Sequence, residues 1–231
     1  MNARELMRLH VEALFTRDAA GRLLAVNEPN GAPAPRFFLG RTADGNAWWF
    51  RHDVDSALAL DLHTLCSAQP TGLAVEGDAD SAAPFIACLS GKEPIRRKWA
   101  GPAFRFPEEL ASNENTVRVT SDNATVLSPY LEEWRSDVSA GAPMVVVLEG
   151  GKAVSVCCSV RVTAQAHEAG VETHPDFRRR GYAACAVSAW AEAVRGLDCI
   201  PLYSTSWENE SSRALAKRLG LVQYGADLHV T

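Results

Sequence analysis

A glycine-containing turn is the segment of this sequence with the clearest potential for chemistry. Residues 173–184 read THPDFRRRGYAA, between a strand-like run and a helical run that starts near Gly181. A turn that opens a helix directs unpaired backbone N–H groups at one point, where the helix dipole also favours an anion. Gly181 permits close approach of the backbone, and Arg178, Arg179 and Arg180 add positive charge. The pattern indicates a phosphate or pyrophosphate site, and the alternative is a solvated run of arginines.

Other chemical motifs are missing or incomplete. His167-Glu168 begins like the zinc-binding pattern H-E-x-x-H, but position 171 is Val171. The sequence contains none of the patterns G-x-x-x-x-G-K-(S/T), G-x-G-x-x-G and G-x-S-x-G. The six cysteines form no C-x-x-C pair, so we interpret them as reduced thiols, mostly buried. We therefore expect no metal, no nucleotide-hydrolysis loop and no disulfide scaffold.

The composition limits the class of protein. The chain has 231 residues, 47% of them hydrophobic, which is enough for one or two domains with a sizeable core. Its formal net charge of -5 argues against binding to nucleic acid or to an anionic membrane. It lacks an apolar run of membrane-spanning length and an N-terminal signal segment. We therefore expect a cytoplasmic protein.

The N-terminal half reads as a mixture of helices and strands. Residues 2–17 have helical spacing, and 36–42 and 46–52 read as a hairpin around Asp44-Gly45. Asp55 is expected to cap a helix over 56–66. Residues 92–115 mix charges with Pro and Gly, so we place a domain boundary near 111, between an N-terminal domain (1–111) and a C-terminal domain (112–231).

The C-terminal half has the elements that would position the turn. The expected strands are 116–120, a hairpin of 144–150 and 153–162 joined at Gly150-Gly151-Lys152, 166–173, 200–205, and a final pair, LVQYG and DLHV. The expected helices are 129–140, 181–195 and 208–219. This order predicts an α/β or α+β fold with a mixed sheet.

Two motifs resemble those of a known family. The order Arg178-x-x-Gly181-x-Ala183 resembles the acetyl-coenzyme A signature of the GNAT superfamily of N-acetyltransferases, (Gln/Arg)-x-x-Gly-x-(Gly/Ala). The strand IPLYST and the helix WENESSRALAKRLGL resemble the second motif of that family, in which an Asn begins a helix that ends in a Leu-Gly turn. The resemblance covers about residues 112–231. It implies a GNAT acetyltransferase fold, preceded here by an N-terminal α/β domain or subdomain of unknown role.

The resemblance also implies which residues would hold acetyl-coenzyme A. Backbone N–H groups of the turn would bind the pyrophosphate, and the preceding strand would pair with the pantetheine arm. Asn209 matches the Asn that hydrogen-bonds pantetheine, and Ser212 lies one turn further along its helix. The expected cofactor-binding set is Val171, Glu172, Thr173, Arg178, Arg179, Arg180, Gly181, Tyr182, Ala183, Ala184, Asn209 and Ser212.

Acetyl transfer to an amine requires removal of a proton from the nucleophile. Glu168 and Glu172 share one face of the strand and His167 points to the other. Glu168 is the expected base, because members of the family often carry a carboxylate at this depth; the alternative is a carboxylate that only fixes substrate. Many members use a Tyr as general acid where this chain has Ala216. Tyr203, Tyr224 or water could replace it.

The resulting expectation is an N-acetyltransferase that acts on a primary amine of a small molecule or a peptide. The alternative is a GNAT-fold module that binds or senses an acyl-coenzyme A without catalysis.

Overall fold

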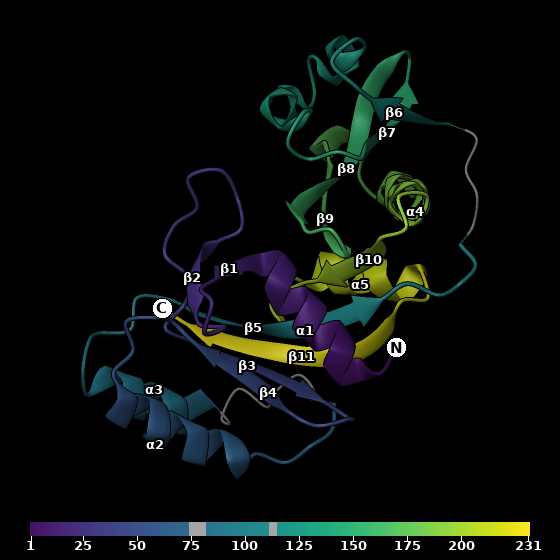
Figure 1. The fold of residues 1–231 in the computed structure, drawn as a ribbon. Coiled ribbons are helices and arrows are strands. Elements are labelled where there is room, and N and C mark those ends of the chain that lie inside the picture. The colour runs from purple at the N-terminus through teal and green to yellow at the C-terminus, as the bar shows by residue number, and fades with distance from the viewer. Residues whose placement is uncertain (74–81, 111–114) are drawn as a thin grey trace. The chain divides into compact units, whose positions relative to one another are not determined.

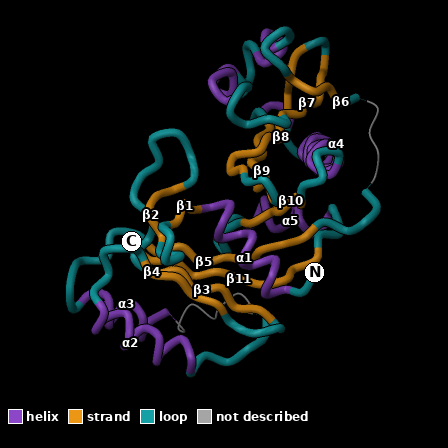
Figure 2. Tube along the Cα trace, in the orientation of Figure 1, coloured by secondary structure: helices purple, strands orange, loops and turns teal. Residues whose placement is uncertain are grey.

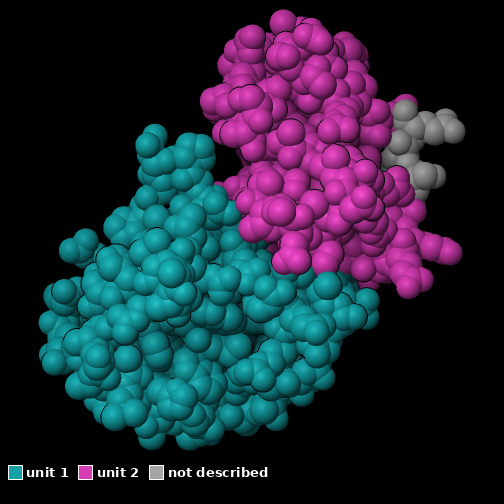
Figure 3. All heavy atoms as spheres, in the orientation of Figure 1, with its two compact units in different colours: residues 1–105, 204–213, 222–231 teal, residues 106–203, 214–221 magenta. Residues whose placement is uncertain are grey.

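The computed structural model describes residues 1–73, 82–110 and 115–231. The described chain forms two compact units (Figure 3). Unit 1 contains residues 1–105, 204–213 and 222–231, and unit 2 contains residues 106–203 and 214–221. The boundary expected near residue 111 lies outside the described residues, and the division into domains 1–111 and 112–231 stays a prediction.

Unit 1 is built on an antiparallel sheet with strand order β4-β3-β11-β5 (Figure 1). The strands are β3 (Phe37–Thr42), β4 (Ala47–Phe50), β5 (Lys98–Arg105) and β11 (Val222–Val230). The pairing of β3 with β4 confirms the hairpin expected around Asp44-Gly45. A separate hairpin of β1 (Phe15–Arg17) and β2 (Leu23–Val26) was not foreseen from the sequence.

Helices cover both faces of this sheet (Figure 1). On one face lies α1 (Ala3–Leu14), which begins with a capping box between Asn2 and Glu5. On the other lie α2 (Ser56–Ser67), capped by Asp55 as expected, and α3 (Ala83–Ser90). Successive residues of β3 point to opposite faces of the sheet. Phe37 and Leu39 pack into the core with α2 and α3, whereas Phe38 contacts His10 of α1.

Unit 2 contains a second run of strands in the order β10-β9-β8-β7-β6. They are β6 (Thr116–Val119), β7 (Met144–Glu149), β8 (Lys152–Val162), β9 (Ala166–Thr173) and β10 (Ile200–Ser204, of which the last residue belongs to unit 1). The helix α4 (Tyr182–Arg195) packs on β7, β8 and β9. Short 3-10 segments, η2 (Ala124–Leu127) and η3 (Glu132–Asp137), share an apolar core with β7 and β8. Figure 2 shows α4 as a helix beside the strands of this unit. A last helix, α5 (Glu210–Arg218), precedes β11.

Two expectations about elements were wrong, and one further strand, β5, was not foreseen. The helix expected over 129–140 is instead the 3-10 segment η3 and its flanks, because residues 132–137 bury no side chain and packing does not stabilise a longer helix there. The final strands are one strand, β11, in which Gly225 sits at a bulge rather than in a turn. The boundary region contains β5, whose Gly101 packs so closely that a side chain would collide with the Thr205 carbonyl.

Candidate functional site

The site begins where two parallel strands stop pairing. Strand β9 pairs with β8 along its length, from His167 to Thr173. Its pairing with β10 covers only residues 166–168, opposite 200–202. From Ala169 to Thr173, β9 therefore presents backbone N–H and C=O groups on its β10 side that no described pairing with β10 uses. An extended ligand can pair with such an edge as an added strand, and Val171, Glu172 and Thr173 lie on it.

The turn after β9 has the backbone conformation of an anion site. A short 3-10 segment, η4 (Pro175–Phe177), leads into it, and both Arg179 (φ 62°) and Gly181 (φ 89°) are left-handed. Gly181 is the N-cap of α4 and provides no side-chain cap. Intrahelical bonding begins at Ala184, whose N–H donates to the Gly181 carbonyl at 3.0 Å. The N–H groups of the first turn of α4 therefore stay open to a ligand at the positive end of the helix dipole.

The arginines of the turn do not all face the same partner. Arg178 Nε donates to the Thr173 carbonyl at 3.1 Å and so ties the turn to the end of β9. Arg180 forms an ion pair with Glu149 at 3.2 Å and lies over the Phe177 ring at 5.3 Å from its centroid. Two of the arginines therefore hold the turn in place.

Tyr182 shares the carboxylate of Glu149 with Arg180. Its hydroxyl donates to Glu149 Oε2, and this hydrogen bond raises the pKa of the tyrosine. The side chain of Tyr182 is therefore engaged with β7, while its backbone remains in the first turn of α4.

The structure brings a fourth cation to the turn that sequence reasoning missed. Nη2 of Arg218, at the end of α5, lies 2.9 Å from where a Cβ on Gly181 would sit. Arg218 is far from the turn in the sequence, so only the fold could reveal this proximity.

The side chains of β9 divide between two environments, as alternation predicts. His167 Nδ1 and Ser159 Oγ share a hydrogen bond of 2.8 Å. The indole N–H of Trp190 in α4 donates to the same hydroxyl at 3.1 Å. Burial lowers the pKa of His167. Glu168 is 2% exposed and pairs in register with Leu202 and Arg161. A carboxylate therefore lies where β9 and β10 stop pairing.

Glu172 is held by residues of other elements and not by an arginine of the turn. Its carboxylate accepts a 2.7 Å hydrogen bond from the Trp134 indole N–H. Its carbonyl accepts from Ser155 Oγ at 3.0 Å. The arginine of the turn that is paired uses Glu149 instead.

Asn209 caps α5. Its Oδ1 accepts from the Ser212 N–H at 3.0 Å and from Ser211 Oγ at 2.9 Å. Asn209 and Ser212 belong to unit 1 and the glycine turn to unit 2, and each unit is described by itself. Their joint role in binding a cofactor stays a prediction.

The residues considered for the general acid are all buried. Ala216 is fully buried, and Tyr203 and Tyr224 are 2% and 4% exposed.

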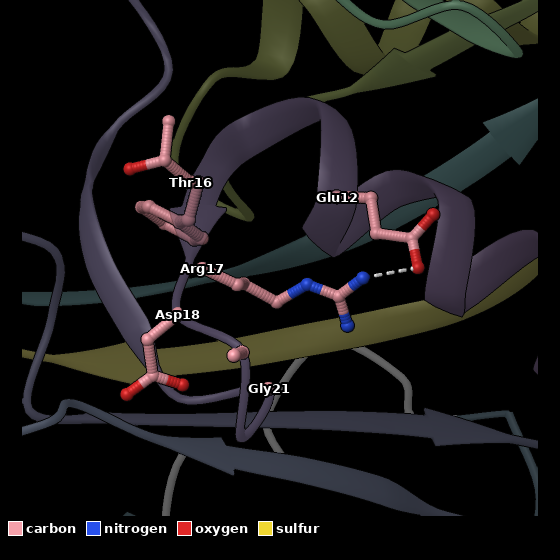
Figure 4. Close-up of a pocket in the computed structure, with 7 residues that line it drawn as sticks. Glu12, Thr16, Arg17, Asp18 and Gly21 are labelled. Carbon is pink, nitrogen blue, oxygen red and sulfur yellow. Dashed lines mark hydrogen bonds and ion pairs between the residues drawn. The ribbon is translucent and has the colours of Figure 1, made fainter.

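A surface pocket of about 500 Å³ lies elsewhere in unit 1, and no predicted site residue lines it (Figure 4). Arg17 and Glu12 form an ion pair of 2.5 Å at its wall.

In the described part of the chain there is no group of three or more His, Cys, Asp or Glu side chains placed to hold a metal ion. The described residues also include no helix that is long and apolar enough to cross a membrane.

Comparisons with known proteins agree with this geometry. A family model described as GNAT acetyltransferase matches residues 125–226. A GNAT-family acetyltransferase from Colwellia psychrerythraea superposes with a TM-score of 0.50 at 11% identity, covering 83% of this chain and 80% of that one, which shows the fold.

Two further solved structures are similar at lower TM-scores. A GCN5-related N-acetyltransferase-like protein from Streptococcus suis gives 0.48 at 16% identity, with all of both chains covered. A putative GNAT acetyltransferase from Novosphingobium aromaticivorans gives 0.49 at 16% identity, and the match covers 59% of this chain and 65% of that one. No protein of curated function matches. Residues 125–226 therefore match the GNAT acetyltransferase family, and the chain has the fold of the GNAT superfamily.

Proposed function

We propose that this protein transfers an acetyl group from acetyl-coenzyme A to a primary amine of a small molecule or a peptide. The observation that carries the proposal is the end of β9: an unpaired strand edge continues into a left-handed, uncapped glycine at the start of α4. These features suit the two parts of coenzyme A, an extended amide-containing arm and a pyrophosphate.

The residues present fit the cofactor. The backbone of Val171, Glu172 and Thr173 would pair with the pantetheine amides, and N–H groups of residues 179–184 would bind the pyrophosphate. A Cβ at position 181 would lie 2.9 Å from Arg218 Nη2, and the φ of 89° there favours glycine. Asn209 uses Oδ1 for its helix cap, which leaves its Nδ2 group to donate to a pantetheine carbonyl.

In the proposed reaction Glu168 removes the proton from the acceptor amine, directly or through water. The bound acetyl-coenzyme A supplies an activated thioester carbonyl. Glu168 suits the role by position, since it lies on β9 at the last residue paired with β10. Glu172 lies beyond the last residue of β9 that pairs with β10, and its carboxylate accepts the Trp134 N–H. An ordinary thiol has a pKa near ~8.5, so the departing thiolate can leave without a dedicated acid, consistent with Ala216 at the usual tyrosine position.

A second function is favoured by Ala216 itself. This residue is fully buried and carries no group that could protonate a thiolate. A protein that binds acyl-coenzyme A as a sensor, without turnover, would need the strand edge and the turn but no acid.

Calorimetry with coenzyme A and a thiol-release assay with acetyl-coenzyme A and a panel of primary amines separate the two functions. Binding in the micromolar range together with amine-dependent release of free coenzyme A supports the transferase. Binding without turnover of any amine supports the sensor. The absence of binding would overturn both.

A further inference from the structure

Three titratable side chains of unit 1 meet between α1 and the sheet, and none of them belongs to the candidate site. His10 of α1 is fully buried, and Asp227 of β11 is 3% exposed. His10 Nε2 lies 3.5 Å from Asp227 Oδ1, and His229 Nε2 lies 3.5 Å from Asp227 Oδ2. A buried carboxylate therefore lies between two imidazole rings, one on the helix and one on its own strand.

The strands beside Asp227 offer its carboxylate no hydrogen-bond donor. In the described part of the chain neither of its oxygens accepts a hydrogen bond. Its cross-strand partners are Gly40 in β3 and Gly101 in β5. The Met7 side chain and the Thr205 carbonyl occupy the space that side chains at these glycines would fill, and neither group is a donor. A carboxylate buried in this way is strongly destabilising unless a cation pairs with it.

The surroundings leave His10 to supply that cation. The side chains that contact the two histidine rings from β1, β3 and β5 are aromatic and carry no charge: Phe15, Phe38 and Trp99. Burial lowers the pKa of His229 to about 4, and the charges of His10 and Arg97 add to this effect, although Asp227 opposes it. His229 is therefore neutral near pH 7, and a proton on His10 balances the carboxylate.

We propose that His10 and Asp227 form a buried imidazolium–carboxylate pair, which fixes α1 to β11 and weakens when His10 loses its proton. An unfolded histidine loses its proton near pH ~6.5, whereas a histidine beside a carboxylate keeps it to higher pH. The contribution of the pair to stability is therefore complete below about pH 6.5 and is lost as the pH rises. The inference is independent of acetyl transfer.

Two measurements on the parent protein test the pair. The ¹⁵N NMR spectrum of the imidazoles should show His10 protonated at both nitrogens at pH 7 and His229 neutral. In denaturant titrations between about pH 6.5 and 8, the unfolding equilibrium constant should rise by up to about tenfold per pH unit. This range ends below the pH of ~8.5 at which the thiols of an unfolded chain ionise.

Two variants assign the pH dependence. Asp227→Asn keeps the shape of the side chain but removes its charge, so the rise of the unfolding constant with pH should disappear. His52→Gln is the matched control, because His52 is an exposed histidine of the same unit. It should keep the slope of the parent.

Hydrogen exchange tests the attachment of α1. After correction for the intrinsic exchange rate, the amides of α1 should lose protection between pH 6.5 and 8, and those of α2, on the other face of the sheet, should not. An equal loss in both helices would overturn the attachment of α1 as the role of the pair. A neutral His10 at pH 7 in the folded parent would overturn the pair itself, whether or not Asp227→Asn folds. A parent-like slope in folded Asp227→Asn would overturn it as well.

Discussion

Asn209 illustrates how one side chain can serve structure and ligand at once. Its Oδ1 caps α5 through the Ser212 N–H, so truncation affects the helix as well as any cofactor contact. Asn209→Ala should lower the free energy of unfolding by about 1 kcal/mol, the typical value of a cap. It should also raise the KM for acetyl-coenzyme A. Asn209→Asp keeps an oxygen for the cap but loses the Nδ2 donor.

The two variants together test the pantetheine contact. Asn209→Asp should melt near the parent temperature yet bind coenzyme A more weakly, by about 0.5–1.5 kcal/mol for one hydrogen bond. Parent-like affinity in Asn209→Asp would show that the residue acts only as a cap.

Glu168 tests the proposed chemistry. Glu168→Gln keeps the shape of the side chain but cannot accept a proton, so turnover should fall by about 10²–10⁴ while coenzyme A affinity stays nearly unchanged. The pH profile gives a second readout. A base contributes to the acidic limb of the rate profile, whereas a carboxylate that only orients the acceptor mainly changes its KM. Parent-like turnover and pH dependence in Glu168→Gln would contradict the assignment.

At the scale of elements, the sequence was most informative where a pattern was local. The hairpin at Asp44-Gly45, the Asp55 cap and the helix that follows Gly181 all depend on residues adjacent in sequence, and the structure contains each of them. Strand β5 was missed because Gly101 and Pro102 signal a break, although the glycine is required by close packing on Thr205. Non-local contacts of this kind leave no periodic trace in the chain.

In the candidate site, too, the local features could be predicted from the sequence and the contacts between distant residues could not. The glycine of the turn and its arginines are consecutive and could be recognised. The pairing of Glu172 with Trp134 and the approach of Arg218 to Gly181 depend on how separate elements pack, and no spacing rule encodes them.

Strand β11 carries a partly buried histidine, His229, that makes stability depend on pH. His229 stacks between Phe38 and Trp99, and burial lowers its pKa to about 4 although Asp227 opposes the change. The charges of His10 and Arg97 act in the same direction as burial. An unfolded histidine takes up its proton near pH ~6.5. As the pH falls, the histidine therefore binds a proton in the unfolded state before it does so in the folded state. Its contribution to stability is complete above about pH 6.5 and is lost as the pH falls to the folded-state pKa of about 4.

We expect the free energy of unfolding to fall by up to about 1.4 kcal/mol per pH unit between about pH 6.5 and 4 from this group. Denaturant titrations at several pH values measure the slope. His229→Phe keeps an aromatic ring between Phe38 and Trp99 and should flatten it. An equal slope in the parent and in His229→Phe would assign the effect to other groups.

At the scale of the whole molecule, unit 1 is not continuous in sequence. Strand β11 lies between β3 and β5 and is paired with both, so the last strand of the chain completes a sheet begun near its start. Leu228 and Val230 of β11 also join the core formed with α2 and α3. Residues 1–110 by themselves would leave β3 and β5 without their shared neighbour and expose this apolar core to water.

A fragment of residues 1–110 should therefore lack a cooperative unfolding transition by circular dichroism. A second fragment, in which a flexible linker joins residues 1–110 to 204–231, restores β11 and the 204–213 segment whose Thr205 N–H donates to the Pro102 carbonyl. It should recover a transition, because β3 and β5 regain β11, the neighbour that they share. Cooperative unfolding of 1–110 alone would show that the N-terminal region folds independently. The final strand would then be an addition to a sheet that is already stable without it.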